Sequence, residues 1–279
     1  MSKSSLPKLA NFEPLAPAIA ARLRSLTPAR VGLGQTGESI CTPELLEFQL
    51  AHARARDAVH APLQPSSLIA DLRTLFKSST APKSEIILLH SAAKDRQTFL
   101  QRPDLGRKLD QPSRQRLKGT ASEQGGLAIV VADGLSALAV ERHAVPLIAA
   151  LLPQIASLKL TPICIVEQAR VAIGDEIADA LGASLVVVLI GERPGLSSPD
   201  SLGAYITWQP RPGITSDAER NCISNIRAEG LSYPQAAARL LHYIDEARSK
   251  RLTGVALKDP DLEQPYSGNQ VAIETGTKP

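Results

Sequence analysis

The sequence has few of the residues that mark disulfide-rich or metal-binding proteins. Its three cysteines, Cys41, Cys164 and Cys222, are an odd number, lie far apart and form no CxxC motif. The five histidines show no HxH or HExxH spacing. These absences argue against a disulfide framework and against a zinc or other metal site, and they indicate a reducing cytosol as the compartment.

Aromatic residues and charge of one sign are also scarce. Aromatics make up 3% of the 279 residues, so the hydrophobic 43% of the chain must build its core from Ala, Leu, Ile and Val. The formal charge is only +3, from 31 basic residues interspersed with 28 acidic ones. We therefore expect no nucleic-acid or membrane-surface partner, because both need a concentrated basic patch.

Long hydrophobic runs are missing as well. Apolar stretches such as residues 185–190 are too short to cross a bilayer, and the N-terminus lacks an apolar secretory core. We expect a soluble intracellular protein whose length allows one large domain or two small ones around a substantial core.

The first third of the chain is predicted to be mainly helical. A short amphipathic helix is expected before residue 30, packed on its own domain in preference to a partner. A second helix is expected to have Thr42 as its N-cap and Pro43 at the first helical position, and a third follows Pro65. The residues expected on the three buried faces are Leu15, Ile19, Leu23 and Leu26; Leu46, Leu50 and Ala53; and Leu68, Leu72, Leu75 and Phe76.

From residue 86 onward, short apolar runs alternate with helical patterns. Continuous Val/Ile/Leu runs are typical of strands covered on both faces, and strand–helix–strand repetition implies right-handed crossovers. We predict an α/β fold: a Rossmann-like parallel sheet flanked by helices over residues 86–257, after a mainly helical N-terminal region (1–85) and before a flexible polar tail (258–279). The expected strands are 86–89, 127–132, 162–166, 185–190 and 205–208, and the expected helices 137–152, 175–181 and 235–249.

Two polar strings are the most informative feature of the chain. They are Arg220-Asn221-Cys222-Ile223-Ser224-Asn225 and Gly191-Glu192-Arg193-Pro194-Gly195-Leu196. Packing explains neither, since the first cannot be a core strand and the second cannot continue one. Residues 133–136, 168–171 and 191–195 each follow a predicted strand, so they are expected at the carboxyl edge of the sheet, where open α/β folds bind ligands.

Two motif matches are weaker. Residues 32–37 fit GxGxxG, but no strand precedes them and no helix opens there, which argues against a dinucleotide site. Gly134-Leu135-Ser136-Ala137-Leu138 is one residue short of the GxSxG nucleophile elbow, with Asp133 and His143 nearby. The favoured interpretation is that Asp133 and Ser136 bond backbone amides at a helix N-terminus. The alternative is a stand-alone α/β hydrolase that uses Ser136, although no complete catalytic set is visible.

Several strings together resemble the small (light) subunit family of the ethanolamine ammonia-lyases, over about residues 29–257. The strings that carry the resemblance are Ala29-Arg30-Val31, Ala55-Arg56-Asp57-Ala58-Val59, Arg102-Pro103-Asp104-Leu105-Gly106-Arg107, Asp133-Gly134-Leu135-Ser136, Gly191-Glu192-Arg193-Pro194-Gly195-Leu196 and Asn221-Cys222-Ile223-Ser224-Asn225-Ile226.

The resemblance implies an adenosylcobalamin-dependent lyase that converts ethanolamine to acetaldehyde and ammonia. It implies a hetero-oligomer with several copies of each subunit, in which a large subunit carries the catalytic residues and this chain carries none. Carried over to this chain, the cobalamin-contacting residues are Val171, Glu192 and Cys222. There is no DxHxxG string, so base-on binding of the cobalamin is expected, without a cobalt ligand from this chain.

The resemblance also implies that the N-terminal region contacts the large subunit. Gln35 and Ala51 depart from the family, which commonly has Arg and an acidic residue there. A paralogue kept as a structural or regulatory partner therefore stays an alternative. Some relatives use an N-terminal amphipathic segment to enter a bacterial microcompartment, which is the expected location; otherwise the protein is cytoplasmic.

Overall fold

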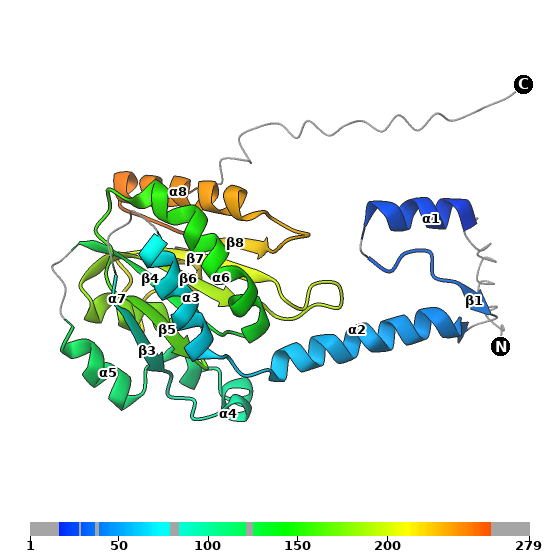
Figure 1. Ribbon diagram of the computed structural model, residues 1–279, viewed down its shortest axis with the longest axis horizontal. Helices are drawn as coiled ribbons and strands as arrows, with labels where there is room; N and C mark the ends of the chain where they lie inside the picture. The colour runs from blue at the N-terminus through cyan, green and yellow to red at the C-terminus, as the bar shows by residue number, and fades with distance from the viewer. Residues whose placement is uncertain (1–16, 28, 37–38, 79–83, 121–124, 258–279) are drawn as a thin grey trace, which may run out of the picture.

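A six-stranded β-sheet, in the order β3-β5-β4-β6-β7-β8, forms the centre of the molecule (Figure 1). The computed structural model describes residues 17–27, 29–36, 39–78, 84–120 and 125–257. The strands are β3 (Ile86–His90), β4 (Gly126–Ala132), β5 (Ile163–Glu167), β6 (Ala183–Gly191), β7 (Leu202–Trp208) and β8 (Asn221–Ile226). The predicted mixed α/β architecture with flanking helices is confirmed for this part of the chain.

The sheet is only partly parallel. β3, β5, β4 and β6 are parallel neighbours, whereas β7 and β8 run antiparallel to the strands beside them. The expectation of a parallel sheet is therefore wrong for its last two strands. The reason is the connection: β4–β5 and β5–β6 are joined through α6 (Ala137–Leu151) and α7 (Ile173–Ala180), but no helix joins β6 to β7. A parallel return needs a crossover, usually helical.

Helices cover both faces of the sheet. On one face α3 (Pro65–Ser78), α6 and α8 (Tyr233–Lys250) pack against alternate strand residues such as Ile129 and Val187. On the other face α5 (Gln111–Lys118) and α7 pack against the intervening residues, such as Val130 and Val188. Both residues of each adjacent pair are buried, as the unbroken apolar runs predict.

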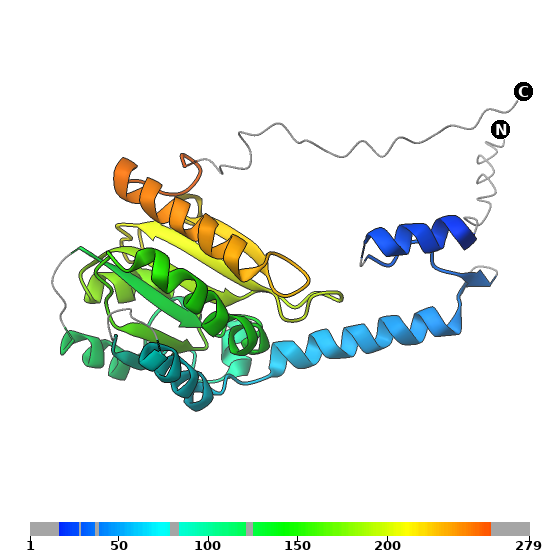
Figure 2. The same cartoon turned by 45° about the horizontal axis from the view of Figure 1, so that its top comes forward.

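The N-terminal elements extend away from this core. α2 (Thr42–His60) projects from the sheet, and α1 (Pro17–Leu26) and the ribbon of β1 (Gln35–Thr36) and β2 (Ser39–Ile40) lie at its far end (Figures 1 and 2). The helix α2 has Cys41 rather than Thr42 as its N-cap. A helix also begins only at Thr42, downstream of the GxGxxG match, which agrees with rejecting a dinucleotide fingerprint there.

The expected buried faces of α1 and α2 are wrong. Leu46 and Leu50 are 58% and 51% exposed, whereas Ala51, Ala55 and Ala58 form the buried side of α2. On α1, Ile19, Leu23 and Leu26 are also exposed, and Leu15 lies outside the described residues. The predicted face of α3 is correct, since Leu68, Leu72 and Phe76 are buried. An apolar stripe marks a surface to be covered, but not what covers it.

Short helices complete the described chain. They are α4 (Arg96–Gln101), η1 (Leu105–Arg107), η2 (Leu152–Ile155) and η3 (Asp217–Glu219). Among the described residues, one helical segment, Ala137–Ile155, is long and apolar enough to cross a membrane by length and composition alone. Its apolar residues pack against the sheet, α3 and α8, as those of a core helix do. The predicted tail, residues 258–279, lies outside the described residues.

Candidate functional site

Three loops meet at the carboxyl ends of β4, β5 and β6, as predicted from the chain order. They enclose a cavity of about 420 Å³. Val171 and Glu192, two of the three predicted cofactor contacts, both line it. The complete lining is Gly134, Leu135, Arg170, Val171, Ile190, Gly191, Glu192, Arg193 and Tyr205.

Cys222, the third predicted contact, lies beside this cavity rather than in its lining. It stands on the edge strand β8, directly opposite Tyr205 of β7, and Tyr205 does line the cavity. Cys222 is an exposed residue overall, its thiol lies 3.5 Å from the Ser224 hydroxyl, and local burial raises the pKa of that thiol. Burial raises the pKa of the Tyr205 phenol, so at neutral pH this neighbour keeps its proton as a hydrogen-bond donor.

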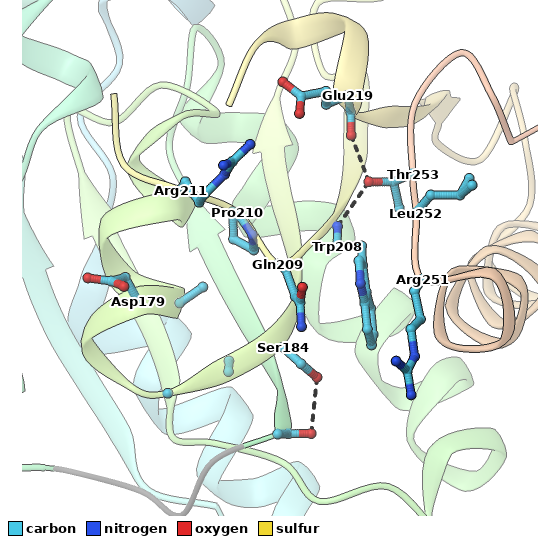
Figure 3. A pocket seen from close by; sticks show the side chains of 14 residues that line it. Asp179, Ser184, Trp208, Gln209, Pro210, Arg211, Glu219, Arg251, Leu252 and Thr253 are labelled. Atoms are coloured by element: carbon cyan, nitrogen blue, oxygen red, sulfur yellow. Dashed lines mark hydrogen bonds between the residues drawn. The ribbon is translucent and has the colours of Figure 1, made fainter. Parts of the chain in front are cut away.

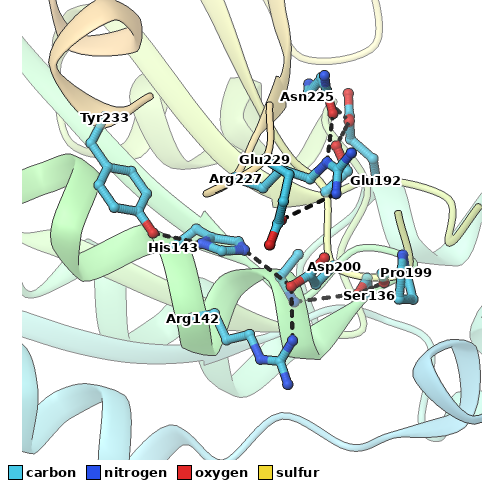
Figure 4. A network of polar contacts seen from close by, with 12 residues as sticks. Ser136, Arg142, His143, Glu192, Pro199, Asp200, Asn225, Arg227, Glu229 and Tyr233 are labelled. Carbon is cyan, nitrogen blue, oxygen red and sulfur yellow. Dashed lines mark hydrogen bonds and ion pairs between the residues drawn. The ribbon is translucent and has the colours of Figure 1, made fainter. Parts of the chain in front are cut away.

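The Glu192 carboxylate is held in a fixed position. Its Oε2 accepts hydrogen bonds from the Ser201 hydroxyl and from the backbone N–H of Asn225, the latter at 3.2 Å (Figure 4). Its own backbone N–H donates to the Ser201 carbonyl at 2.9 Å. Within the described part of the chain no hydrogen bond is made to Oε1, which lies near Gly203, so this oxygen keeps its capacity to accept one.

Asp133 fixes the loop after β5. Its buried carboxylate accepts hydrogen bonds from the backbone N–H groups of Gln168 and Ala169, both at 2.9 Å, and lies 3.7 Å from the Arg96 guanidinium. Burial raises the pKa of Asp133 to about 6, although these bonds and Arg96 act in the opposite direction. The prediction that Asp133 bonds amides of the helix that follows it is wrong, because its partners belong to the next loop along the sheet edge.

Ser136 is a helix cap rather than a nucleophile. It is fully buried, accepts a hydrogen bond from the Ala139 N–H at the start of α6 and donates to the Pro199 carbonyl at 2.8 Å. His143 bonds the Tyr233 hydroxyl at 2.8 Å and lies 3.4 Å from Asp200 (Figure 4). A hydrolytic triad needs the histidine on the serine oxygen, so the hydrolase alternative is wrong.

The first two residues of the string at 220–225 turn out to be structural. Arg220 and Asn221 are 7% and 8% exposed. The Arg220 guanidinium bonds the Asp175 carboxylate at 2.7 and 2.8 Å, and the Asn221 amide bonds the backbone of Gly254 and Leu257. Packing therefore does explain these two residues, contrary to the sequence-based interpretation, and β8 itself is a half-exposed edge strand rather than a core strand.

Two buried polar atoms at the site lack partners. Gln168 Oε1 and Arg170 Nε make no hydrogen bond within the described part of the chain. Gln168 also has a φ of 55°, which is uncommon for a residue other than glycine. Buried polar groups are nearly always bonded to protein or to ordered water, so each of these two atoms can take a partner that the described chain does not supply.

Sequence reasoning missed an arginine–aromatic stack next to the cavity. The buried Phe99 ring has the Arg170 guanidinium 4.3 Å and the Arg96 guanidinium 4.9 Å from its centroid. Arg96 also donates to the carbonyls of Val59, Gly134 and Leu135. The position of Arg170 three residues after a strand was the one available signal; nothing local marks Arg96 or Phe99.

A larger cavity, of about 750 Å³, lies at the opposite edge of the sheet, near the amino ends of β4 and β6 (Figure 3). Gly125, Ser184, Trp208, Arg211 and Arg251 are among its lining residues, and none of the predicted contacts is. Open α/β sheets bind ligands at the carboxyl ends of their strands, so size alone does not identify the site. Among the described residues, no three His, Cys, Asp or Glu side chains come together in a way that holds a metal ion.

Comparison with known proteins identifies relatives along nearly the whole chain. A protein-family profile described as ethanolamine ammonia-lyase light chain (EutC) matches residues 18–258. An ethanolamine ammonia-lyase small subunit from Pseudomonas aeruginosa (strain LESB58) is 52% identical over 280 residues, covering 96% of this chain and 98% of the relative. The protein of the same description from Azotobacter vinelandii (strain DJ / ATCC BAA-1303) is 56% identical over 243 residues, covering 85% and 87%. A third, from Xanthomonas campestris pv. campestris (strain ATCC 33913), is 52% identical and covers 92% and 93%.

Proposed function

The chain belongs to the ethanolamine ammonia-lyase light-chain family, and from that premise we propose that it closes an adenosylcobalamin site at the interface with a large catalytic subunit. The complex converts ethanolamine to acetaldehyde and ammonia. Adenosylcobalamin, when bound, supplies the carbon-centred radical that starts this reaction. This chain supplies binding and enclosure, and the residues that act on ethanolamine are on the large subunit.

The observation that carries the proposal is the cavity at the carboxyl edge, with Val171 and Glu192 in its lining and Cys222 beside it. Cobalamin carries amide side chains around its corrin ring, which need both donors and acceptors. Glu192 Oε1, which accepts no hydrogen bond within the described chain, suits an amide N–H. Cys222 contributes as a small neighbour and not as a ligand to cobalt.

We further assign residues 86–257 as a Rossmann-like cofactor domain. The support is the parallel β3-β5-β4-β6 core with helices on both faces and the site at its carboxyl edge. A cavity of about 420 Å³ holds only part of a molecule as large as cobalamin. This chain would therefore cover one side of the cofactor, and the large subunit would cover the rest.

The N-terminal projection, residues 17–60, is the proposed contact with the large subunit. Nine of the twelve exposed large hydrophobic residues of the described chain lie in it: Ile19, Leu23, Leu26, Leu33, Ile40, Leu45, Leu46, Phe48 and Leu50. Apolar patches of this kind mark protein–protein interfaces. Ala51, which replaces the family's acidic residue, lies on the buried side of α2 and is therefore not part of this exposed stripe.

The exposed apolar surface of α1 is also the basis for proposing that the enzyme lies inside a bacterial microcompartment. The exposed residues Ile19, Leu23 and Leu26 of α1 form an amphipathic segment suited to a shell protein, if the large subunit leaves them uncovered. Co-sedimentation of the complex with shell particles, compared for Leu23→Asp and wild type, tests this. Equal recovery of both would favour a cytoplasmic enzyme.

The deciding experiment is ammonia release from ethanolamine plus adenosylcobalamin. It is run with this chain alone, with the large subunit alone and with both. We expect activity only in the mixture. A mixture that co-purifies without activity would favour the structural paralogue, and failure to associate would contradict the proposal.

A further inference from the structure

Positive charge is concentrated around the cavity at the carboxyl edge. The Arg170 guanidinium is half-buried there, and its pKa is lowered by burial and, after that, by the positive charges of Arg96, Arg107 and Arg193. Asp133 acts in the opposite direction, and it is already bonded by two backbone amides and faced by Arg96. Counted together with Glu192, which lines the same cavity, the group has four arginines and two carboxylates, so its net charge is positive.

Arg96 and Arg170 share one aromatic ring but differ in their remaining contacts. Arg96 donates to three backbone carbonyls, so each of its three guanidinium nitrogens is engaged by the fold. Arg170 has no ion pair and no side-chain hydrogen bond within the described residues, and its Nε is buried without a partner. Its backbone N–H is fixed on the Gly106 carbonyl at 2.7 Å and its guanidinium on Phe99. A preorganised guanidinium without a counter-ion is suited to an anionic ligand.

Arg193 completes the arrangement from the neighbouring loop. It follows Glu192 in the loop after β6 and lines the cavity together with Arg170, which comes from the loop after β5. It is exposed and has no ion pair within the described residues. The cavity lining thus offers two kinds of charged group: the Glu192 carboxylate, which suits donors, and the pair of Arg170 and Arg193, here called the positive pole, which suits an acceptor with negative charge.

We propose that Arg170 and Arg193 form a phosphate subsite that binds the phosphodiester of the cobalamin nucleotide loop. The inference rests on the proposed function, since it names the part of cobalamin that Arg170 and Arg193 recognise. The amides of the corrin periphery are neutral, and the phosphodiester is the permanent anion of the molecule. A guanidinium presents a planar pair of N–H donors that matches two phosphate oxygens, so it recognises this group better than an amide. The positive pole therefore selects complete cobalamin over a corrin that lacks the nucleotide loop.

The test uses the complex with the large subunit and two probes, cyanocobalamin and dicyanocobinamide, which lacks the nucleotide and its phosphodiester. Binding is measured by equilibrium dialysis with corrin absorbance as the readout. Arg170→Gln is expected to weaken cobalamin binding about tenfold to a hundredfold, as for a lost charged hydrogen bond, and to leave cobinamide binding unchanged. Arg170→Lys, which keeps the charge without the planar fork, is expected to fall between wild type and Arg170→Gln.

The controls separate a subsite from a general effect of charge or folding. Arg107→Gln removes a charge near Arg170 from a residue that does not line the cavity, so it should change both affinities little. Arg193→Gln, in an exposed loop position, repeats the test if Arg170→Gln fails to fold. Equal loss of cobalamin and cobinamide in both variants would overturn the phosphate subsite. If the wild-type complex bound neither probe, the proposed function itself would fall, together with this inference.

Discussion

Arg220 and Asp175 form a buried two-point ion pair that ties the start of β8 to α7. The two guanidinium nitrogens lie 2.7 and 2.8 Å from the two carboxylate oxygens, and each side chain is 2% exposed. Thr207 of β7 bonds the same guanidinium at 3.2 Å. The pair therefore holds the antiparallel edge of the sheet, where Cys222 and Asn225 stand, against the parallel part.

Breaking this pair should destabilise the protein strongly. Arg220→Met leaves the Asp175 carboxylate buried without its partner, for which we expect a loss of about 3–5 kcal/mol in the free energy of unfolding. Urea unfolding of the full chain measures it. The double variant Arg220→Met/Asp175→Leu should recover most of the loss, because neither charge is then left alone. Arg102→Met, in the exposed pair with Asp104, is the matched control and should change little. A similar effect in both single variants would contradict this account.

Glu192 is expected to affect cofactor affinity without affecting the fold. Glu192→Ala removes the acceptor at the cavity and should weaken cobalamin binding to the complex about tenfold to a hundredfold, as expected for a charged hydrogen bond. Calorimetric titration of the complex with cyanocobalamin gives the affinity. Glu229→Ala removes a carboxylate that is 74% exposed and pairs with Arg227, so it should leave the affinity unchanged. Unchanged affinity in Glu192→Ala would exclude Glu192 as a contact.

The exposed face of α2 should control association with the large subunit. Leu46→Asp places a charge on a side chain that is 58% exposed, so the isolated chain should fold normally while the complex weakens at least tenfold. Analytical ultracentrifugation of the mixture measures the association. Ile214→Asp, at a 65% exposed position outside the projection, is the control and should associate as wild type does. If the Leu46→Asp variant associated with the large subunit as wild type does, the exposed face of α2 would not be the contact between the two subunits.

The sequence predicts the elements of the central fold well because the apolar runs are continuous. Residues 127–132 and 185–190 lie inside β4 and β6, and both are buried on two faces. Prediction from the sequence fails where the direction of a strand or the burial of a side chain depends on residues far away in the chain. The direction of β7 depends on the helix-free loop after β6, and the exposure of the α2 leucines depends on how that helix projects from the sheet, which its local pattern does not encode.

The sequence predicts which strand ends form the site, but not which side chains bond to one another there. The loops that hold Val171 and Glu192 are predictable because each follows an apolar run, and parallel strands bring their carboxyl ends together. The choice of these two residues within the loops comes from the family resemblance. The contact of Asp133 with Gln168 spans 35 residues and that of Arg96 with Gly134 spans 38. No local pattern encodes such a pair, and for the same reason the polar string at 220–225 concealed the structural role of Arg220.

Asp133 predicts a specific pH dependence of stability. Burial raises its pKa from 3.8 to about 6, so between these values the folded protein binds more protons than the unfolded chain. The contribution of protonated Asp133 to the free energy of unfolding is therefore fully present below pH 3.8 and is lost as the pH rises through 6. Relative to Asp133→Asn, the free energy of unfolding of wild type should fall by roughly 2 kcal/mol from pH 4 to 6.5. A rise over this range would show that the two amide bonds and Arg96 outweigh burial.

Gly191 is expected to tolerate no side chain at the cavity. A Cβ built there would lie 2.0 Å from the Ser136 carbonyl oxygen and 2.6 Å from that of Asp133, both backbone atoms of the loop after β4. Gly191→Ala must therefore push two of the three site loops apart, at a cost of about 1–3 kcal/mol or more, and should weaken cobalamin binding too. Gly213→Ala is the control: its φ is 72°, but its Cβ would meet nothing within 4 Å, so only about 1 kcal/mol of backbone strain is expected. Urea unfolding ranks the two variants, and the dialysis measurement then shows whether the loss of affinity follows the displaced loops. If Gly191→Ala were as mild as Gly213→Ala, the close approach of the β4 and β6 loops would not be what shapes the cavity.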